Sequence, residues 1–209
     1  MAKKVLVVLG HPAANSLCAR IARAYADGAR DGGADVRMLA LGELQFSPLL
    51  AAGYREEQLL EPDLQQAQRD ILWAEHLVWV YPVWWGGMPA LLKGFIDRVF
   101  LPGFAFRYRK GSRAWDRLLA GRTAELLVTM DSPPWYYRWV TRMPAHVQMK
   151  RAILDFCGVG PVRVHSMGPV LGASDARKAD WQAQARRLGE RQGVSACGRW
   201  WPLSAVWCR

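Results

Sequence analysis

An unbroken apolar run near the start of the chain, Val5 to Leu9, limits most strongly what this sequence can fold into. The run is rich in β-branched residues and stops at Gly10, which is typical of a strand buried on both faces, as in a parallel sheet. Asn15 and Ser16 then offer capping side chains, and residues 17–25 place apolar side chains at four-residue spacing on one helical face. The segment therefore predicts a strand, a loop and a helix.

The same alternation of strand and helix recurs along the rest of the chain. The further expected strands are Val36–Leu41, Leu77–Tyr81, Thr123–Thr129 and Val162–Met167. The expected helices after the first are Asp63–Ala74, Pro89–Phe100, Val147–Phe156 and a last one from Ser174 to about Gln192. With right-handed crossovers, these pairs predict an α/β fold with a doubly wound five-stranded parallel sheet and helices on both faces. Ligands in such folds bind beyond the carboxyl ends of the strands.

Length and composition suit one compact domain. The chain has 209 residues, of which 51% are hydrophobic, and residues 1–192 are expected to form that domain. Residues 193–209 carry Trp200, Trp201 and Trp207 without periodicity and are expected to be a tail that packs on the domain or on a partner subunit. The long, basic and aromatic segment Phe104–Gly121 fits a second hairpin, a lid or part of a partner interface.

Charge and hydropathy exclude some classes of function. The formal charge of +10 favours anionic ligands such as dinucleotide phosphates. The basic residues are scattered without a nucleic-acid-binding signature, so no nucleic-acid partner is expected. Apolar runs fall short of the ~20 residues of a membrane-spanning helix, which predicts a cytoplasmic protein without membrane insertion. The four cysteines lie far apart without a C-x-x-C pair, so buried reduced thiols and no metal site are expected.

The loop after the first strand, Gly10 to Ser16, joins a buried strand to a helix N-terminus. Free backbone amides and the positive end of the helix dipole make such a junction an anion site, to which His11 and Ser16 add side-chain groups. Neither the G-x-G-x-x-G fingerprint nor the G-x-x-x-x-G-K-[ST] loop is present, so a mononucleotide phosphate is the better candidate ligand. The alternative is that Asn15 and Ser16 only cap the helix.

The loop after the third strand, Tyr81 to Pro89, contains two adjacent tryptophans and two glycines. Trp84 and Trp85 at the carboxyl edge of a sheet supply flat apolar area for a flavin ring, and backbone groups beside them can meet the polar edge of that ring. Gly86 and Gly87 permit close approach of the backbone. The alternative is that both tryptophans belong to an ordinary core.

This second loop also carries a family resemblance. The stretch from Tyr81 to Phe100, followed by Gly103 to Phe106, resembles the NAD(P)H:quinone oxidoreductases related to DT-diaphorase. Leu154 to Gly158 and Asp175 to Arg177 extend the resemblance, which spans about Val5 to Arg191. It implies a flavodoxin-like fold and a flavin-dependent NAD(P)H dehydrogenase that reduces quinones or related acceptors two electrons at a time, by a ping-pong hydride mechanism.

The resemblance assigns cofactor positions residue by residue. The flavin-binding positions fall on His11, Ser16, Leu17, Cys18, Pro82, Val83, Trp84, Trp85, Gly86, Thr129, Met130 and Asp131. Trp85 corresponds to the aromatic residue beside which the ring stacks in the family. Asp97 and Arg177 match positions near the adenine half of FAD, which favours FAD as the cofactor and leaves FMN as the alternative.

The resemblance also assigns catalytic and pocket residues. The catalytic tyrosine of the family falls on Tyr137, whereas the histidine six residues later is replaced by Met143, and His146 nearby is the candidate substitute. The alternatives are a surface aromatic at Tyr137 and a capping or surface histidine at His146. Phe106 and Tyr108 match aromatics that close the substrate pocket from a partner subunit, so a homodimer is implied.

The sequence departs from the pattern of the family at two further places. The chain is shorter than the diaphorases around residues 50–61, a region that helps hold the adenosine, and Met130-Asp131-Ser132 replaces Thr-Gly-Gly after the fourth strand.

The main rival function is a flavin-binding ancillary subunit of a potassium-efflux system, docked to the membrane transporter. A flavodoxin-like electron carrier is disfavoured because such carriers are usually acidic. The choice between NADH and NADPH stays open.

Overall fold

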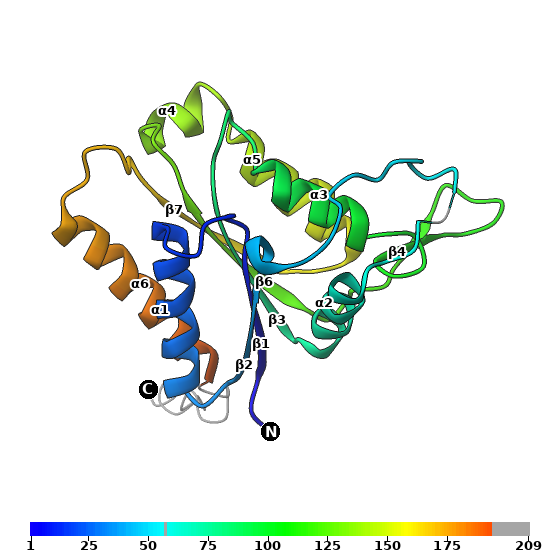
Figure 1. The fold of residues 1–209 in the computed structure, drawn as a ribbon, viewed down its shortest axis with the longest axis horizontal. Coiled ribbons are helices and arrows are strands. Elements are labelled where there is room, and N and C mark those ends of the chain that lie inside the picture. The colour runs from blue at the N-terminus through cyan, green and yellow to red at the C-terminus, as the bar shows by residue number, and fades with distance from the viewer. Residues whose placement is uncertain (57, 194–209) are drawn as a thin grey trace, which may run out of the picture.

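The computed structural model describes residues 1–56 and 58–193. Five parallel strands form the central sheet in the order β2-β1-β3-β6-β7 (Figure 1). Their bounds are β1 Lys4–Leu9, β2 Asp35–Ala40, β3 His76–Pro82, β6 Thr123–Thr129 and β7 Val162–Met167. The expected α/β fold with a doubly wound sheet is thereby confirmed, and each expected strand lies within one residue of its predicted bounds.

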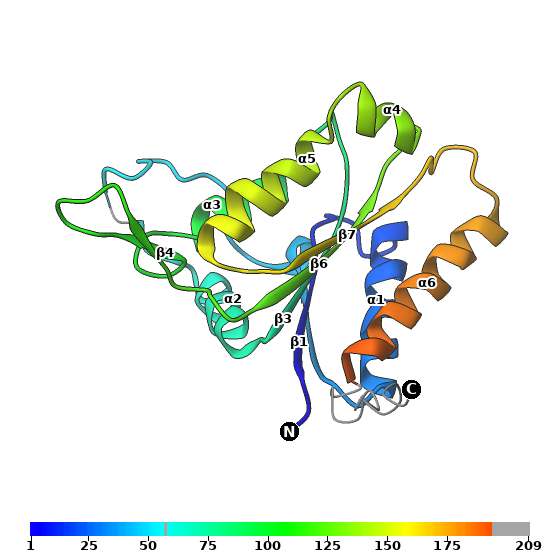
Figure 2. The ribbon, with the colours of Figure 1, turned by 180° about the vertical axis from the view of Figure 1, so that it is seen from behind.

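Helices cover both faces of the sheet (Figures 1 and 2). One face carries α1 (Leu17–Asp31) and α6 (Asp175–Gly193), which lie side by side. The other carries α2 (Pro62–Trp73), α3 (Ala90–Val99), α5 (Pro144–Val147) and the π-helix η2 (Gln148–Asp155). Because β3 lies at the centre with a helical layer on each side, all of its residues are buried. The unbroken apolar runs in the sequence are explained by this double cover.

Two glycines allow α1 and α6 to pack closely. A Cβ added at Gly28 would overlap the carbonyl oxygen of Arg186, and one added at Gly189 would overlap the carbonyl oxygen of Tyr25. The two backbones therefore approach at positions where only hydrogen is tolerated. This contact closes one of the two hydrophobic clusters of the core, around Val7, while the other fills the space under α2 and α3.

Four parts of the structure differ from or extend the sequence prediction. The helix expected at Val147–Phe156 starts earlier, with α5, and is wound as a π-helix over most of its length. The basic aromatic segment forms the antiparallel hairpin of β4 (Phe106–Tyr108) and β5 (Trp115–Arg117), one of its three interpretations. The short helix α4 (Pro134–Trp139) was not anticipated. Leu41, expected at the end of β2, begins the 3-10 turn η1 (Leu41–Glu43).

Arg98 anchors the long segment that leads from η1 to α2. Its buried guanidinium donates hydrogen bonds to the Glu61 carboxylate (2.7 and 3.2 Å), to the Ser47 carbonyl (2.6 Å) and to the Leu59 carbonyl (3.0 Å). Desolvation opposes the charge of Glu61, but the hydrogen bonds from Arg98 and the Ser47 N–H lower its pKa overall. The segment is thus fixed to α3 at both of its ends.

Three further sequence expectations concern the cysteines, the C-terminal tail and the absence of a membrane-spanning helix. Cys18 and Cys157 are buried free thiols, as expected, and Cys197 and Cys208 lie outside the described residues. The same holds for the proposed tail, residues 193–209, except for Gly193, which is the last residue of α6. Within the part of the chain that the structure describes, no helix is both long and apolar enough to cross a bilayer.

Candidate functional site

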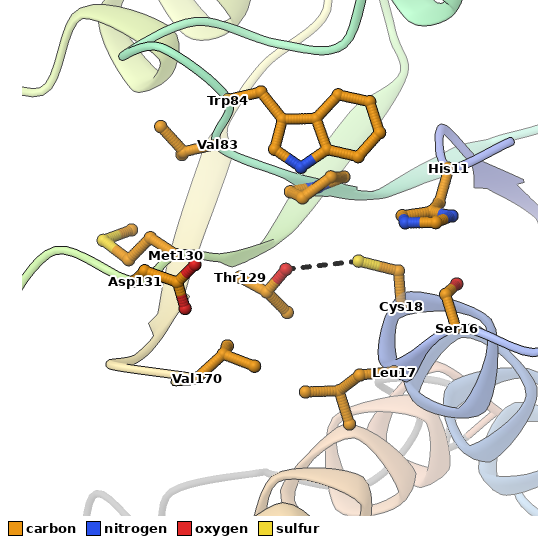
Figure 3. A pocket seen from close by; sticks show the side chains of 11 residues that line it. His11, Ser16, Leu17, Cys18, Val83, Trp84, Thr129, Met130, Asp131 and Val170 are labelled. Atoms are coloured by element: carbon orange, nitrogen blue, oxygen red, sulfur yellow. Dashed lines mark hydrogen bonds between the residues drawn. The ribbon is translucent and has the colours of Figure 1, made fainter. Parts of the chain in front are cut away.

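The chain runs from β1 outward to β2 and then back to β3 on the other side of β1. The loops after β1 and β3 therefore leave the sheet in opposite directions from neighbouring strands, and such a switch in strand order opens a crevice at the carboxyl edge. The loops after β6 and β7 reach the same edge. A cavity of about 230 Å³ lies there, lined by His11, Ser16, Leu17, Cys18, Pro82, Val83, Trp84, Thr129, Met130, Asp131 and Val170 (Figure 3).

The N-terminus of α1 forms one end of this cavity. The Ser16 hydroxyl accepts a hydrogen bond from the Ala19 N–H at 3.2 Å and so caps the helix. The N–H groups of Leu17 and Cys18 belong to the first turn, which has no acidic residue, and intrahelical acceptors do not reach them. His11 accepts from the Ala13 N–H at 2.9 Å, and burial lowers its pKa. This end of the cavity suits an anion.

Cys18 and Thr129 form the floor between the two ends. Their side chains meet with Sγ 3.2 Å from Oγ1 (Figure 3). Burial raises the pKa of the Cys18 thiol to about 11, so the thiol stays protonated at neutral pH. A protonated thiol is a poor nucleophile, and Cys18 therefore serves as wall and hydrogen-bonding group.

Trp84 to Gly87 form a tight turn above the cavity. The N–H of each of these two residues donates to the carbonyl of the other, at 3.0 and 2.9 Å. The central residues, Trp85 and Gly86, have φ angles of 50° and 77°, as both positions of a type I′ turn require. A tryptophan in this left-handed region is strained, and such strain clusters at functional sites.

The turn gives the two tryptophans different positions. The Trp84 ring lies over the cavity with its centroid 5.4 Å from that of His11 (Figure 3), and its side chain is 45% exposed. Trp85 is fully exposed and does not line this cavity. Of the two tryptophans, only Trp84 forms a wall of this cavity, and the stacking position that the family resemblance assigns to Trp85 stays a prediction.

A second cavity of about 480 Å³ adjoins the first. Its lining is Val83, Trp84, Trp85, Gly86, Met130, Asp131, Ser132, Tyr137 and Thr141, so four residues are shared between the two. Asp131 belongs to both, and its carboxylate accepts a hydrogen bond from the Leu171 N–H at 2.8 Å. The two cavities form one continuous crevice that has an anion-suited end and an aromatic end.

Tyr137 is a buried part of this site and is only 3% exposed, which overturns the alternative of a surface aromatic. Its hydroxyl donates to the Gly86 carbonyl at 3.3 Å and accepts from the Ala145 N–H at 3.0 Å. Burial raises its pKa. The hydroxyl therefore stays protonated and connects the tryptophan turn to the start of α5.

His146 lies behind Tyr137, with ring centroids 5.1 Å apart. It is 5% exposed, which overturns the alternative of a capping or surface histidine, but it lines neither cavity. Its Nε2 is 2.9 Å from the Ser166 hydroxyl, and desolvation lowers its pKa to about 4. The imidazole is neutral at pH 7 and supports Tyr137 from the core side.

The structure does not bring the other candidate residues into the crevice. Asp97 pairs with Lys93 at 2.7 Å and lies with Phe106 and Tyr108 in a separate cavity of about 650 Å³ under α3 and η2. Arg177 lies on α6 with its guanidinium 5.6 Å from the Trp181 ring. No group of metal-ligating side chains occurs among the described residues.

Two residues that line the crevice, Thr141 and Val170, are missing from the sequence prediction, and Ser132 appears there only as part of the loop Met130-Asp131-Ser132. Val170 follows β7, and the rule that ligands bind at the carboxyl ends of strands extends to that loop. Thr141 belongs to the stretch after α4, a helix that the sequence pattern did not reveal. Its hydroxyl donates to the Tyr137 carbonyl at 2.9 Å.

Several known proteins are similar to this chain over most of its length. A family model described as flavodoxin-like fold matches residues 3–191. A protein of Haemophilus influenzae named as an uncharacterized NAD(P)H oxidoreductase is 29% identical over 87% of this chain and 92% of its own length. The mouse ribosyldihydronicotinamide dehydrogenase [quinone] is 24% identical over 95% and 97%. The crystal structure of Smu.1420 from Streptococcus mutans is 27% identical, with a TM-score of 0.74 over 90% of this chain and 98% of that one.

Proposed function

The chain belongs to the family of the flavodoxin-like fold, and on that premise we propose that it is a flavin-dependent NAD(P)H dehydrogenase that reduces quinones or related acceptors. One observation carries the proposal: a helix N-terminus and a tryptophan turn face one crevice at the switch point of the sheet. The names of the relatives, an NAD(P)H oxidoreductase and a quinone-linked dehydrogenase, support the same reaction. They do not favour an ancillary subunit of a potassium-efflux system.

The residues present fit a flavin. The unpaired amides of Leu17 and Cys18 at the start of α1 suit a ribityl phosphate. Trp84, Pro82 and Val83 supply apolar area for the ring system, and the loop after Thr129 brings backbone groups to a polar edge. When bound, a flavin supplies the hydride chemistry: it accepts hydride from NAD(P)H and passes it to the acceptor.

The residues of the second cavity bind and orient the reactants. The nicotinamide binds first, in this cavity of about 480 Å³ beside Trp85. The acceptor binds in the same space once the oxidised nicotinamide has left. NAD(P)H, one proton and a quinone are thus converted to NAD(P)⁺ and a quinol. Tyr137 holds the turn that forms one wall, and the neutral His146 keeps Tyr137 in place. Trp85 lines the same cavity from the tryptophan turn.

We favour FMN ahead of FAD as the flavin. Both cofactors share the ring and the first phosphate, for which the crevice has residues. The two positions that approach adenine in the family, Asp97 and Arg177, line neither cavity, and the segment that holds adenosine there is short in this chain. Identification of the released flavin by mass distinguishes the two cofactors.

A homodimer and a cytoplasmic location complete the proposal. Phe106 and Tyr108 are remote from the crevice of their own chain, so they close a substrate pocket only if a second copy presents them. NAD(P)H is a cytoplasmic reductant, which supports the location. The choice between NADH and NADPH is decided by kinetics with each.

The test is to purify the protein, record its visible spectrum and measure steady-state rates with NAD(P)H and a small water-soluble quinone. A yellow protein with parallel double-reciprocal plots is expected, because the two reactants use one space in turn. A colourless protein that binds neither FMN nor FAD in titration would overturn the proposal.

A further inference from the structure

Helix α4 and the residue after it expose a set of aromatic and basic side chains that the proposed reaction does not use. We call this set the α4 surface: Trp135, Tyr136, Arg138, Trp139 and Val140. Trp135 is 64% and Trp139 72% exposed. Large aromatic side chains gathered at one exposed place mark an interaction surface more often than chance exposure does.

The geometry of α4 separates an inner from an outer face. Tyr137 points inward and bonds to Gly86. Trp135 and Trp139 each lie two residues away, about 200° around the helix, so both project on the opposite side. The outward tryptophans therefore follow from the same short helix that positions the site.

The charge around this surface is positive over a long stretch. The sequence from Ser132 to Leu154 contains no Asp or Glu, and it contains the cations Arg138, Arg142, Lys150 and Arg151. Arg138 lies over the Trp139 ring at 5.2 Å, so charge and aromatic area share one place. The preceding acid, Asp131, faces the crevice and binds the Leu171 N–H.

The α4 surface lies at the mouth of the crevice. Tyr137 and Thr141 line the second cavity from α4 and the stretch behind it, and Trp85 lines it from the tryptophan turn. Exposed Leu171 follows β7 at the same carboxyl edge. Both ribbon views show α4 at the outer tip of the fold, beyond the ends of β6 and β7 (Figures 1 and 2).

We propose that the α4 surface docks the protein on an anionic lipid bilayer, with the mouth of the crevice toward the membrane. Tryptophan and tyrosine partition to the headgroup region of bilayers, and arginines are attracted by anionic headgroups. A second copy of this chain fits the α4 surface less well: the proposed homodimer contact runs through Phe106 and Tyr108, and a two-fold contact through the α4 surface would bring basic residues of one copy toward those of the other.

Docking narrows the acceptor class, a step that rests on the proposed function. With its mouth at the bilayer, the crevice receives hydrophobic quinones dissolved in the membrane. Such a quinone takes up the hydride and one proton and leaves as the quinol, so the balance of the reaction does not change. A quinone that diffuses in water needs no such surface.

The test measures docking without turnover, by flotation of the holoprotein with phosphatidylcholine vesicles that contain or lack an equal share of phosphatidylglycerol. Binding to the anionic vesicles alone, reduced by added salt, is expected. Arg138→Glu should weaken it at least about fivefold, the effect of one basic side chain near an anionic surface. Trp135→Ser combined with Trp139→Ser should abolish it.

Matched controls use exposed residues away from the α4 surface: Arg187→Glu on α6 and Leu72→Ser at the end of α2 should bind like the wild type. Equal binding by all variants, or none by the wild type, would overturn the proposal. Loss of a dimer in the tryptophan variant, with no vesicle binding by the wild type, would assign the surface to a second copy instead.

Activity separates this proposal from the proposed function. The Trp135→Ser/Trp139→Ser variant should reduce a water-soluble quinone at the wild-type rate and lose at least about tenfold in rate with a long-chain quinone held in anionic vesicles. Failure with both quinones in the wild type would count against the reaction itself. Equal rates of wild type and variant with the vesicle quinone would count against docking alone.

Discussion

The hydroxyl of Tyr137 donates a hydrogen bond to the carbonyl oxygen of Gly86, 3.3 Å away, and so connects α4 to the tryptophan turn. Tyr137→Phe removes this bond and one of the two acceptors of the Ala145 N–H, which keeps the Gly86 carbonyl at 3.1 Å, so a loss of about 1 kcal/mol of stability is expected. Flavin should bind more weakly because the turn is less constrained. Urea unfolding and flavin titration measure both, with the more exposed Tyr136→Phe as control. Unchanged stability and affinity would mean that the bond is not used.

The two tryptophans should affect different steps. Trp84→Ala opens both cavities and should weaken flavin binding about tenfold, since a buried aromatic contact is worth about 1 kcal/mol beyond its area. Trp85→Ala should retain flavin and change kcat/KM for the quinone, because of the two cavities of the crevice Trp85 lines the second and not the first. Titration and steady-state rates separate the effects. Loss of flavin in the Trp85 variant alone would restore the position implied by the family resemblance.

His146 should make the protein less stable in mild acid. Its pKa is about 4 in the folded state against an ordinary value of 6.5, so between these values the unfolded state binds a proton that the folded state does not. Stability is therefore complete above pH 6.5, falls as the pH drops toward 4 and loses no more from this group below that, by about 3 kcal/mol in all. Urea unfolding of wild type and His146→Gln, repeated at several pH values across this range, gives the free energy of unfolding at each pH. This free energy should fall less steeply with decreasing pH in the variant. Equal slopes would contradict the prediction.

The ion pair between Glu61 and the buried Arg98 should contribute strongly to the free energy of unfolding. Glu61→Gln leaves the buried guanidinium without a counter-charge and should cost about 3 kcal/mol of stability. Asp27→Asn, which breaks the exposed pair with Arg30, should cost less than about 1 kcal/mol. Thermal unfolding of both variants provides the comparison. A small effect in both would show that the Arg98 hydrogen bonds to backbone carbonyls suffice.

Tyr108→Asp tests whether a second copy completes the site. Tyr108 is exposed in the single chain, so the change should not unfold it, whereas a charge buried in a dimer interface without a partner costs several kcal/mol. Analytical ultracentrifugation should show a flavin-loaded monomer, and steady-state assays of this monomer should show little quinone turnover. A monomer as active as the wild type would show that Tyr108 and Phe106 do not contribute to the site.

The sheet and the crevice were predictable because local patterns determine them. Buried strands such as β3 are visible as apolar runs, and the carboxyl-edge rule brings the loops after β1, β3 and β6 together wherever the side chains point. Side-chain direction was not predictable. Which of Trp84 and Trp85 covers the cavity depends on a left-handed turn, and α4 is a short helix without amphipathic repeat, stabilised through Tyr137 by tertiary contacts.

The anchoring of Ser47, Leu59 and Glu61 by Arg98 makes the chain between them a closed loop with both ends held on α3. Doubling the length of such a loop costs only about 0.6 kcal/mol in closure entropy. Lengthening the chain there should therefore leave β3 and the crevice undisturbed. The loop is thus a place where protein engineering can add binding residues without rebuilding the core.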